Sequence, residues 1–212
     1  MGKINKVRVN LGALDELLEE FSKNVTIKVG IIGNKAAQKH EGSDLTNAEL
    51  GAVHEFGATI NATNKMRGYF YHKFGINKSS EPIIIPTRSF LRMPLIGADA
   101  RKEIIKKVIE SIGQDEALVE FLNTKPSKNE MDNAWREEVK SVIPKDLMVG
   151  LAEVIGQAAL ERVWEAIETD GFEKWIPTTE FTREHRKGSA GNPSLEDTGE
   201  LKKAISFEVI KN

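Results

Sequence analysis

Three short stretches are the most informative part of this sequence: His54-Glu55-Phe56-Gly57, Ile85-Pro86-Thr87-Arg88-Ser89-Phe90-Leu91-Arg92 and Asp197-Thr198-Gly199-Glu200-Leu201. Each stretch combines a residue that interrupts regular structure with an apolar or charged residue that can anchor it. None of the three contains a set of side chains typical of a catalytic site. We therefore interpret them as joints that fix the shape of a scaffold, and they favour a role in assembly.

The composition predicts a soluble protein without a metal or redox site. The 212 residues include 30 Lys and Arg against 32 Asp and Glu, so no global charge drives the chain toward nucleic acid or acidic membranes. The chain has no cysteine, which excludes disulfides and thiolate metal sites and is compatible with a reducing cytoplasm. No apolar run is long enough to cross a membrane. We expect no cofactor.

The N-terminal third predicts a helix, a strand and a second helix. Apolar residues at helical spacing predict a helix at 14–21, and the β-branched run from Val25 to Ile32 predicts a strand. Leu50 to Phe56 follow as a short helix. Gly57 stands where it would accept a left-handed turn at the end of that helix.

An extended β arm is predicted at about 58–86. Tyr69 to Phe74 and Pro82 to Ile85 are aromatic or β-branched, and a Gly-, Asn- and Ser-containing segment separates them. Two such runs around a turn indicate a long hairpin.

The second half of the chain is predominantly helical in pattern. Apolar residues at helical intervals predict a helical insertion at 97–142 and a long helix at about 144–170, which Gly171 would end. Residues 178–195 lack periodicity and predict a mobile loop.

Near the C-terminus, Asp197 is placed to cap a turn with Glu200 in a capping box, and 204–210 alternate as a terminal strand. We expect an α+β fold in which a small, mostly antiparallel sheet packs on the long helix. Residues 1–96 form the N-terminal half of its core with the β arm, 97–142 are the helical insertion, and 143–212 complete the core.

Enzyme activity is not favoured by the titratable residues. The four histidines, His40, His54, His72 and His185, are scattered, with no metal-binding pair and no cysteine partners. An enzyme whose residues meet only in the folded chain is the weakest of three hypotheses.

The second hypothesis is a nucleic-acid-binding protein. In residues 67–74, Arg67 and Lys73 are interleaved with aromatic side chains, among them Tyr69 and Tyr71, which would stack on bases if the segment were a strand. The segment partly resembles an RNA-recognition motif, but Phe70 stands where a small residue is needed. The simpler interpretation is a strand with one apolar face.

Five segments, taken in order, carry a further resemblance: Val29-Gly30-Ile31-Ile32-Gly33, Ala52-Val53-His54-Glu55-Phe56-Gly57, Ile85 to Arg92, Trp175-Ile176-Pro177 and Leu195 to Ile205. In this order they resemble the virion-morphogenesis, or tail-completion, family of tailed bacteriophages and prophages. The chain departs from the pattern in its aromatic segment between Gly57 and Pro86, and in Ser89, where a second proline often stands.

The resemblance implies a structural protein of the virion neck that forms a ring, expected to be hexameric, and is assembled in the cytoplasm of the bacterial host. Its partners would be the head connector or stopper and the tail terminator or tail tube proteins, with non-specific contact to DNA in the channel left open. A head-to-tail ring closes only when its subunits are held at the correct rotation, so rigid joints suit it.

The residues expected at the interface lie in the joints. Arg88 and Arg92 would make bidentate contacts, and Phe90 and Leu91 would be apolar anchors beside Glu55 and Phe56. The alternative for Phe90 and Leu91 is that they cover the internal core.

Overall fold

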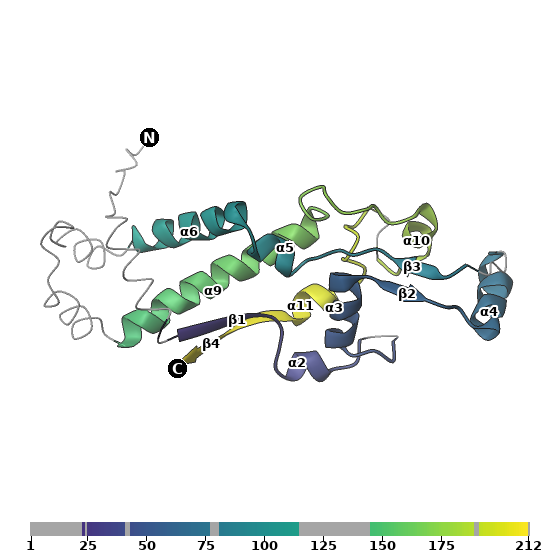
Figure 1. Ribbon diagram of the computed structural model, residues 1–212, viewed down its shortest axis with the longest axis horizontal. Coiled ribbons are helices and arrows are strands. Elements are labelled where there is room, and N and C mark those ends of the chain that lie inside the picture. Colours follow the sequence, from purple (N-terminus) through teal and green to yellow (C-terminus); the bar gives the residue numbers. More distant parts are fainter. Residues whose placement is uncertain are drawn as a thin grey trace, which may run out of the picture. The chain divides into compact units, whose positions relative to one another are not determined.

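The computed structural model describes residues 23, 25–40, 43–76, 81–114, 145–188 and 191–211 (Figure 1). In chain order its elements are β1 (Val25–Ile31), α2 (Asn34–Ala37), α3 (Asn47–Phe56), β2 (Ala58–Ile60), α4 (Asn64–Phe74), β3 (Ile83–Ile85), α5 (Arg92–Leu95), α6 (Ala98–Ile112), α9 (Lys145–Glu168), α10 (Glu180–His185), α11 (Glu200–Ala204) and β4 (Ile205–Lys211). The expected helix at 14–21 and residues 115–142 of the expected insertion lie outside the described residues.

The prediction of an α+β fold is confirmed. About half of the described residues are helical, and two small antiparallel sheets pack against helices. Within the described residues the strands form two separate ribbons, β1 with β4 and β2 with β3. The strands expected at 25–32 and 204–210 are present as β1 and β4.

The chain divides into two compact units, each described by itself. The first consists of residues 1–30, 97–162 and 207–212, and the second of 31–96 and 163–206. The expected division of the chain at 96 and 142 stays a prediction.

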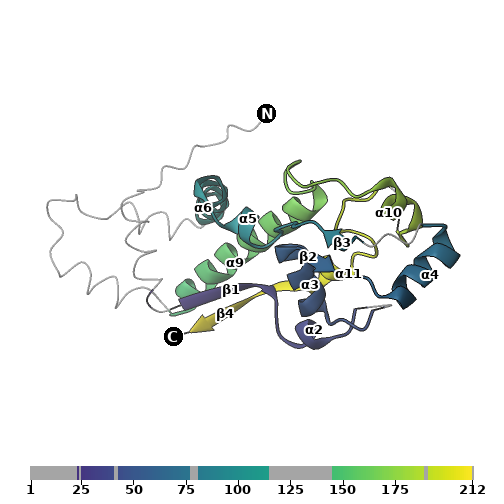
Figure 2. The ribbon, with the colours of Figure 1, turned by 45° about the vertical axis from the view of Figure 1, so that its right-hand side comes forward.

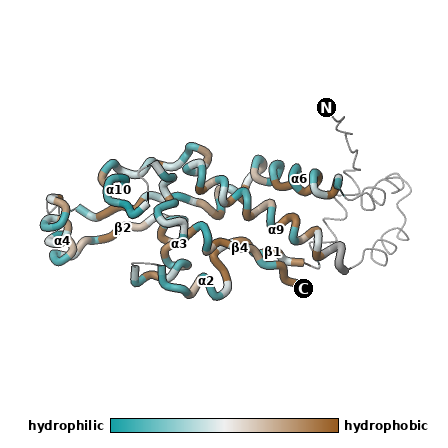
Figure 3. Tube along the Cα trace, turned by 180° about the vertical axis from the view of Figure 1, so that it is seen from behind, coloured by the Kyte–Doolittle hydropathy of each residue, from teal (hydrophilic) through white to brown (hydrophobic). Residues whose placement is uncertain are grey.

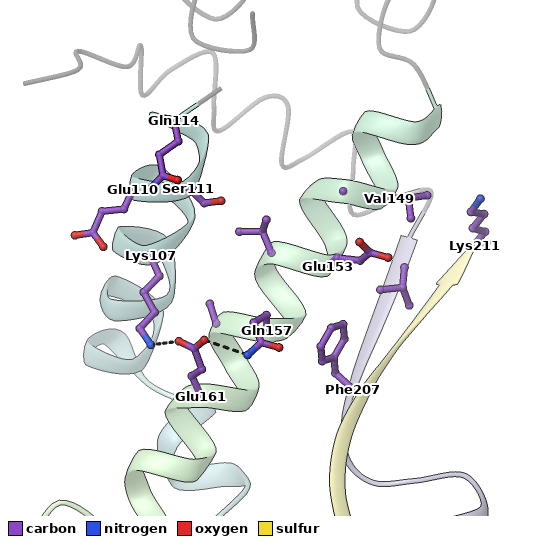
Figure 4. Close-up of a pocket in the computed structure, with 14 residues that line it drawn as sticks. Lys107, Glu110, Ser111, Gln114, Val149, Glu153, Gln157, Glu161, Phe207 and Lys211 are labelled. Carbon is purple, nitrogen blue, oxygen red and sulfur yellow. Dashed lines mark hydrogen bonds and ion pairs between the residues drawn. The ribbon is translucent and has the colours of Figure 1, made fainter. Parts of the chain in front are cut away.

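The first unit combines α6, the first part of α9 and the β1–β4 ribbon, with α9 between the other two (Figure 4). Hydrophobic residues recur among hydrophilic ones along α6 and α9 (Figure 3), as helices with one buried face require. Their buried side chains include Ala100, Val108, Ile112, Leu151, Ala152, Ala158, Ala159 and Leu160.

A glycine sets the closest approach of α9 to the ribbon. A Cβ atom built on Gly156 would lie 2.7 Å from Cε2 of Phe207 and nearer still to its Cδ2. The aromatic ring of β4 therefore occupies the space that any other residue at 156 would fill, and this part of the sheet packs directly on the helix backbone.

The second unit is built around one fully buried phenylalanine. Phe90 has no exposed surface, and neither has Val163 or Ile167 from the C-terminal end of α9. Other buried members of this unit are Trp175, Leu195, Leu201, Ala204 and Ile205. Helix α9 ends at Glu168, close to the end expected at Gly171, and the Gly171 N–H donates to the Ala166 carbonyl at 2.6 Å.

The prediction of a β-strand at 69–74 is wrong, because this segment lies in helix α4. The side chain of Thr63 caps the helix by accepting from the Met66 N–H, and Gly75 ends it in a left-handed conformation. Met66, Phe70 and Phe74 recur at a spacing of four and form one half-buried face. The aromatic residues have a general preference for strands, but capping and helical spacing decide the outcome here.

The arm itself is present in another form. β2 and β3 pair antiparallel in the register Ala58 with Ile85, Thr59 with Ile84 and Ile60 with Ile83. α4 lies at the far end of this ribbon, away from α3 (Figures 1 and 2). We use the name arm for residues 58–85 from here on.

Two turn predictions also need correction. Helix α3 ends at Phe56 as expected, but Gly57 has φ 75° and ψ 168°, which is outside the left-handed helical region and leads straight into β2. Asp197 caps no helix: α11 begins after Gly199, and the Asp197 carboxylate accepts from the Gly188 N–H at 2.6 Å. The expected loop at 178–195 contains the short helix α10.

Candidate functional site

Glu55 is the centre of the joint between α3 and the segment that follows the arm. A capping box formed by Thr46 and Glu49 fixes the start of α3, and nine residues later Glu55 points away from solvent with 3% of its surface exposed. Its carboxylate accepts from Ser89 Oγ at 2.7 Å, Leu91 N at 2.9 Å, and Arg92 N and Nε at 3.2 and 2.8 Å. A single buried carboxylate therefore organises the turn at 89–92.

The protonation of Glu55 reflects this environment. Burial alone raises the pKa of its carboxyl, because it disfavours the charged form, but hydrogen bonds from Leu91, Arg92 and Ser89 together outweigh burial. The pKa of Glu55 therefore lies below its ordinary value, and the group is ionised at neutral pH. A charged, fully hydrogen-bonded carboxylate in this position holds structure rather than moving protons.

Phe56 and Arg92 bring this joint to the surface. The Phe56 ring is 62% exposed, and the Arg92 guanidinium lies over it at 4.6 Å from the ring centroid. The same guanidinium donates to Glu55, so the buried carboxylate holds its edge and the Phe56 ring lies against its face. Phe56 and Arg92 form a pre-ordered, exposed apolar and cationic pair.

Arg88 and Phe90 are buried inside the single chain. Arg88 is only 5% exposed. Its side-chain Nη2 donates to the Ile176 carbonyl at 3.1 Å, and its backbone N–H donates to the His54 carbonyl at 2.8 Å. Burial lowers the pKa of Arg88, and the charge of Asp170 opposes that shift. Phe90 lies in the internal core, which was the alternative to an interface position, and Leu91 is half-buried.

The arm carries several exposed apolar side chains. Ile84 is 70% exposed, Ile83 37%, Tyr69 53% and Tyr71 48%. Ile83 and Ile84 point to opposite faces of the ribbon because neighbouring residues of a strand alternate. A two-stranded ribbon is marginally stable by itself, so exposed isoleucines on both faces leave hydrophobic area that a partner could cover.

His54 lines a cavity of about 360 Å³ in the second unit, together with His40, Lys187 and Glu200 among others. His40 Nδ1 lies 3.1 Å from Asn47 Oδ1 and 3.3 Å from a Glu200 oxygen. Burial, reinforced by the nearby Arg88 and His40, lowers the pKa of His54 to about 4. The His54 ring is therefore uncharged at neutral pH.

The first unit has a larger open groove of about 950 Å³ between α6, α9 and β4 (Figure 4). Lys107 Nζ donates to Glu161 Oε2 at 2.6 Å, and Gln157 Nε2 donates to its other oxygen at 3.0 Å. These hydrogen bonds, with Lys107 first, hold the pKa of Glu161 below its ordinary value. The polar side chains of Lys107, Gln157 and Glu161 are thus hydrogen-bonded to one another and are not directed at a ligand.

Neither hollow contains a metal-ligand cluster among the residues that the structure describes. Within the ranges that the structure describes, no three His, Cys, Asp or Glu side chains are grouped to hold a metal ion. Over the same residues, no helix is long and apolar enough to cross a membrane.

Of the predicted site residues, the structure brings Glu55, Phe56, Leu91 and Arg92 together in one joint, with Arg88 and Phe90 in the interior beside it. The other four predicted residues all lie on α4: Arg67, Tyr69, Tyr71 and Lys73. Their part in an interface stays a prediction.

Sequence reasoning missed the role of Ser89, which appeared only as a position without the usual proline. Its hydroxyl donates to Glu55 and accepts from the Met93 N–H at 3.2 Å. The family pattern often has a proline at this position, and proline has no hydroxyl. The pattern therefore could not reveal the hydrogen bond that Ser89 makes to Glu55, 34 positions away.

No protein-family model matches the chain, and searches of curated proteins and of solved structures gave no match either.

Proposed function

We propose that this protein is a structural subunit of a tailed-bacteriophage or prophage neck, which assembles into a ring and joins the tail to the head connector. The observation that carries the proposal is the arm: a ribbon and helix that leave exposed apolar side chains, mounted on a joint held by a buried carboxylate. Such a rigid mount preserves the angle between neighbouring subunits, and ring closure depends on that angle.

The ordered resemblance of the sequence segments supports the same proposal. Three of its elements meet in the Glu55 joint: the end of α3, the turn at 89–92, and Ile176, whose carbonyl accepts from Arg88. Three of the five segments that carry the resemblance are therefore linked by the hydrogen bonds at the base of the arm, which is the function expected of joints in an assembly subunit.

The exposed surface suits contact between proteins. Ile84 and Phe56 are 70% and 62% exposed, and Arg92 is fixed over Phe56. Aromatic and aliphatic anchors beside an arginine are characteristic of the residues that dominate binding energy at protein interfaces. The proposed contact places these side chains against the next subunit or against a neighbouring neck protein.

The nucleic-acid hypothesis no longer has its original basis. Residues 67–74 form a helix, so they cannot serve as the aromatic strand of an RNA-recognition motif.

The test of the proposal is light scattering with negative-stain imaging of the purified protein, alone and mixed with tail tubes or tailless heads from the same phage or prophage. We expect rings, or monomers that cap the ends of tubes. A folded monomer that ignores both particles would remove the proposal.

A matched pair of variants locates the contact. Ile84→Asp puts a charge on the arm, and Ile96→Asp puts the same charge at an equally exposed isoleucine outside it, each position being 70% exposed in the single chain. We expect Ile84→Asp to remain folded and to lose ring formation or tube capping, and Ile96→Asp to behave as the wild type. Equal assembly by both variants would exclude the arm.

A further inference from the structure

The outward face of α4 carries a local excess of basic side chains, although the chain as a whole has a net charge of −2. Lys65, Tyr69, His72 and Lys73 are all exposed, and their spacing places them on one side of the helix. The sequence has no aspartate or glutamate between Glu55 and Glu81. In a chain with a slight excess of acidic residues, the cations of α4 thus have no carboxylate on their own segment.

The neighbouring helix restricts this basic surface to α4. Phe74 packs edge-on against Phe181 and His185 of α10, with centroid distances of 5.3 and 5.0 Å. α10 carries Glu180 and Glu184 against a single Arg183, so its carboxylates outnumber its arginine and α10 does not extend the basic surface. The contact with α10 fixes the inner face of α4 and leaves the lysine face outward.

The rings of Tyr69, Phe70 and Phe74 contact one another, and the helical spacing places the exposed Tyr71 away from the lysine face. Tyr69 makes edge contacts with Phe70 and Phe74 at 5.9 and 6.0 Å between centroids. Its hydroxyl accepts a hydrogen bond from Lys73 Nζ at 2.7 Å, and the same ammonium lies 5.2 Å from the Tyr69 ring centroid. A ring held in this way orients a lysine and is poorly placed to stack on a base.

The remaining binding capacity of the helix is cationic. The ammonium group of Lys73 has three donors, one of which is directed to Tyr69, and the Lys65 side chain is exposed eight residues away on the same face. Arg67 is half-buried and donates from Nε to the Ala62 carbonyl at 2.9 Å, so it belongs to the inner side of the arm.

We infer that the outward face of α4 binds the phosphate backbone of duplex DNA through Lys65 and Lys73, without reading its sequence. Lysine ammonium groups bind phosphates electrostatically and do not read bases. The inference rests on the proposed function only for the source of the DNA, which passes through a phage neck. A ring would present one such helix per subunit and so multiply a weak contact.

The test is retention of the full chain on cellulose that carries duplex DNA, measured at a series of NaCl concentrations. A dense column reports weak binding whether or not the protein forms rings, so failure here is separate from failure of ring assembly. The variant is Lys65→Gln with Lys73→Gln. Its control is Lys102→Gln with Lys106→Gln, which makes the same charge change at two exposed lysines of α6.

We expect the logarithm of the retention factor to fall with the logarithm of salt concentration, with a slope that is smaller by about two in the α4 variant and unchanged in the α6 control. Circular dichroism confirms that each variant is folded. Equal slopes for both double variants, or no retention of the wild type at low salt, would overturn the inference.

Two further outcomes identify a different ligand. Stronger retention on single-stranded than on duplex DNA would point to base stacking and contradict the phosphate contact. Displacement of the bound protein by polyglutamate at the same charge concentration as free duplex DNA would point to an acidic protein partner, and it would likewise reject DNA as the ligand.

Discussion

Arg92 Nε lies 2.8 Å from Glu55 Oε1, and the two side chains differ sharply in exposure, 54% for Arg92 and 4% for Glu55. The pair therefore connects the interior of the second unit to its surface. An ion pair of this kind is sensitive to loss of its buried member, because the remaining donors then face no acceptor of full charge.

Glu55→Gln should lower the free energy of unfolding by about 2 kcal/mol, because the amide lacks the charge and places an NH₂ group among donors. Urea denaturation of the variant measures the loss. Glu103→Gln, at an exposed position of α6, is the control and should leave the midpoint unchanged. Equal effects of the two substitutions would mean that the hydrogen bonds of Glu55 contribute nothing.

Acid should destabilise the protein through His54 before it does so through Glu55. The pKa of His54 is lowered from 6.5 to about 4, chiefly by burial, so the unfolded chain binds a proton that the folded chain does not bind in this window. Stability from the neutral ring is complete above pH 6.5 and is lost as the pH falls toward 4. The loss amounts to roughly 3 kcal/mol at pH 4.

His54→Gln removes this proton linkage. Between pH 6.5 and 4 the free energy of unfolding should fall less steeply in the variant than in the wild type, whatever its absolute value. His72→Gln, on the exposed face of α4, is the control for the loss of an imidazole that is not buried. A wild-type slope in the His54 variant would assign the acid sensitivity to other groups.

Glu55 acts in a lower window. Because its folded pKa lies below 4.5, its stabilising contribution is complete above about pH 4.5 and is lost as the pH falls through the folded value. Below pH 4.5 the wild type should therefore lose stability faster than Glu55→Gln, and the two unfolding curves should converge. Parallel curves down to pH 3 would contradict a depressed pKa.

Two glycines of α9 should respond oppositely to the same substitution. Gly150→Ala meets no atom within 4 Å and should stabilise the helix by about 0.5–1 kcal/mol. Gly156→Ala would press on the Phe207 ring and should destabilise the protein by about 1–3 kcal/mol in spite of the same gain in helix propensity. Thermal unfolding of both variants decides whether Phe207 packs where the structure places it.

The elements that sequence could predict are those set by local rules. β1, α3, the end of α9 and β4 follow from β-branched runs, apolar spacing and chain-breaking residues, all within a few neighbours. α4 follows from equally local signals, its Thr63 cap and the spacing of Met66, Phe70 and Phe74, whereas the strand prediction for this segment relied on its aromatic content. That error concerns the choice between two local rules.

The candidate site depended on contacts that no local rule contains. Glu55 meets donors 34 to 37 residues further along the chain, and Arg88 meets a carbonyl 88 residues away. The sequence predicts Glu55 and Arg88 as interface residues, but whether they face a partner or the interior is decided only when the turn at 89–92 closes on α3. The cap expected at Asp197 failed similarly, because its carboxylate is taken by Gly188.

The two ends of the arm are fastened to each other at its base. Thr87 Oγ1 donates to the Phe56 carbonyl at 3.1 Å, and the backbone N–H of Arg88 donates to the His54 carbonyl. Glu55 accepts hydrogen bonds from three of the next four residues. Because the entropy of closing a loop grows only slowly with its length, a change in the length of the projecting part costs the base little. The length of residues 58–85 is therefore open to change by evolution or by an engineer, within the limit that the contact of Phe74 with α10 sets.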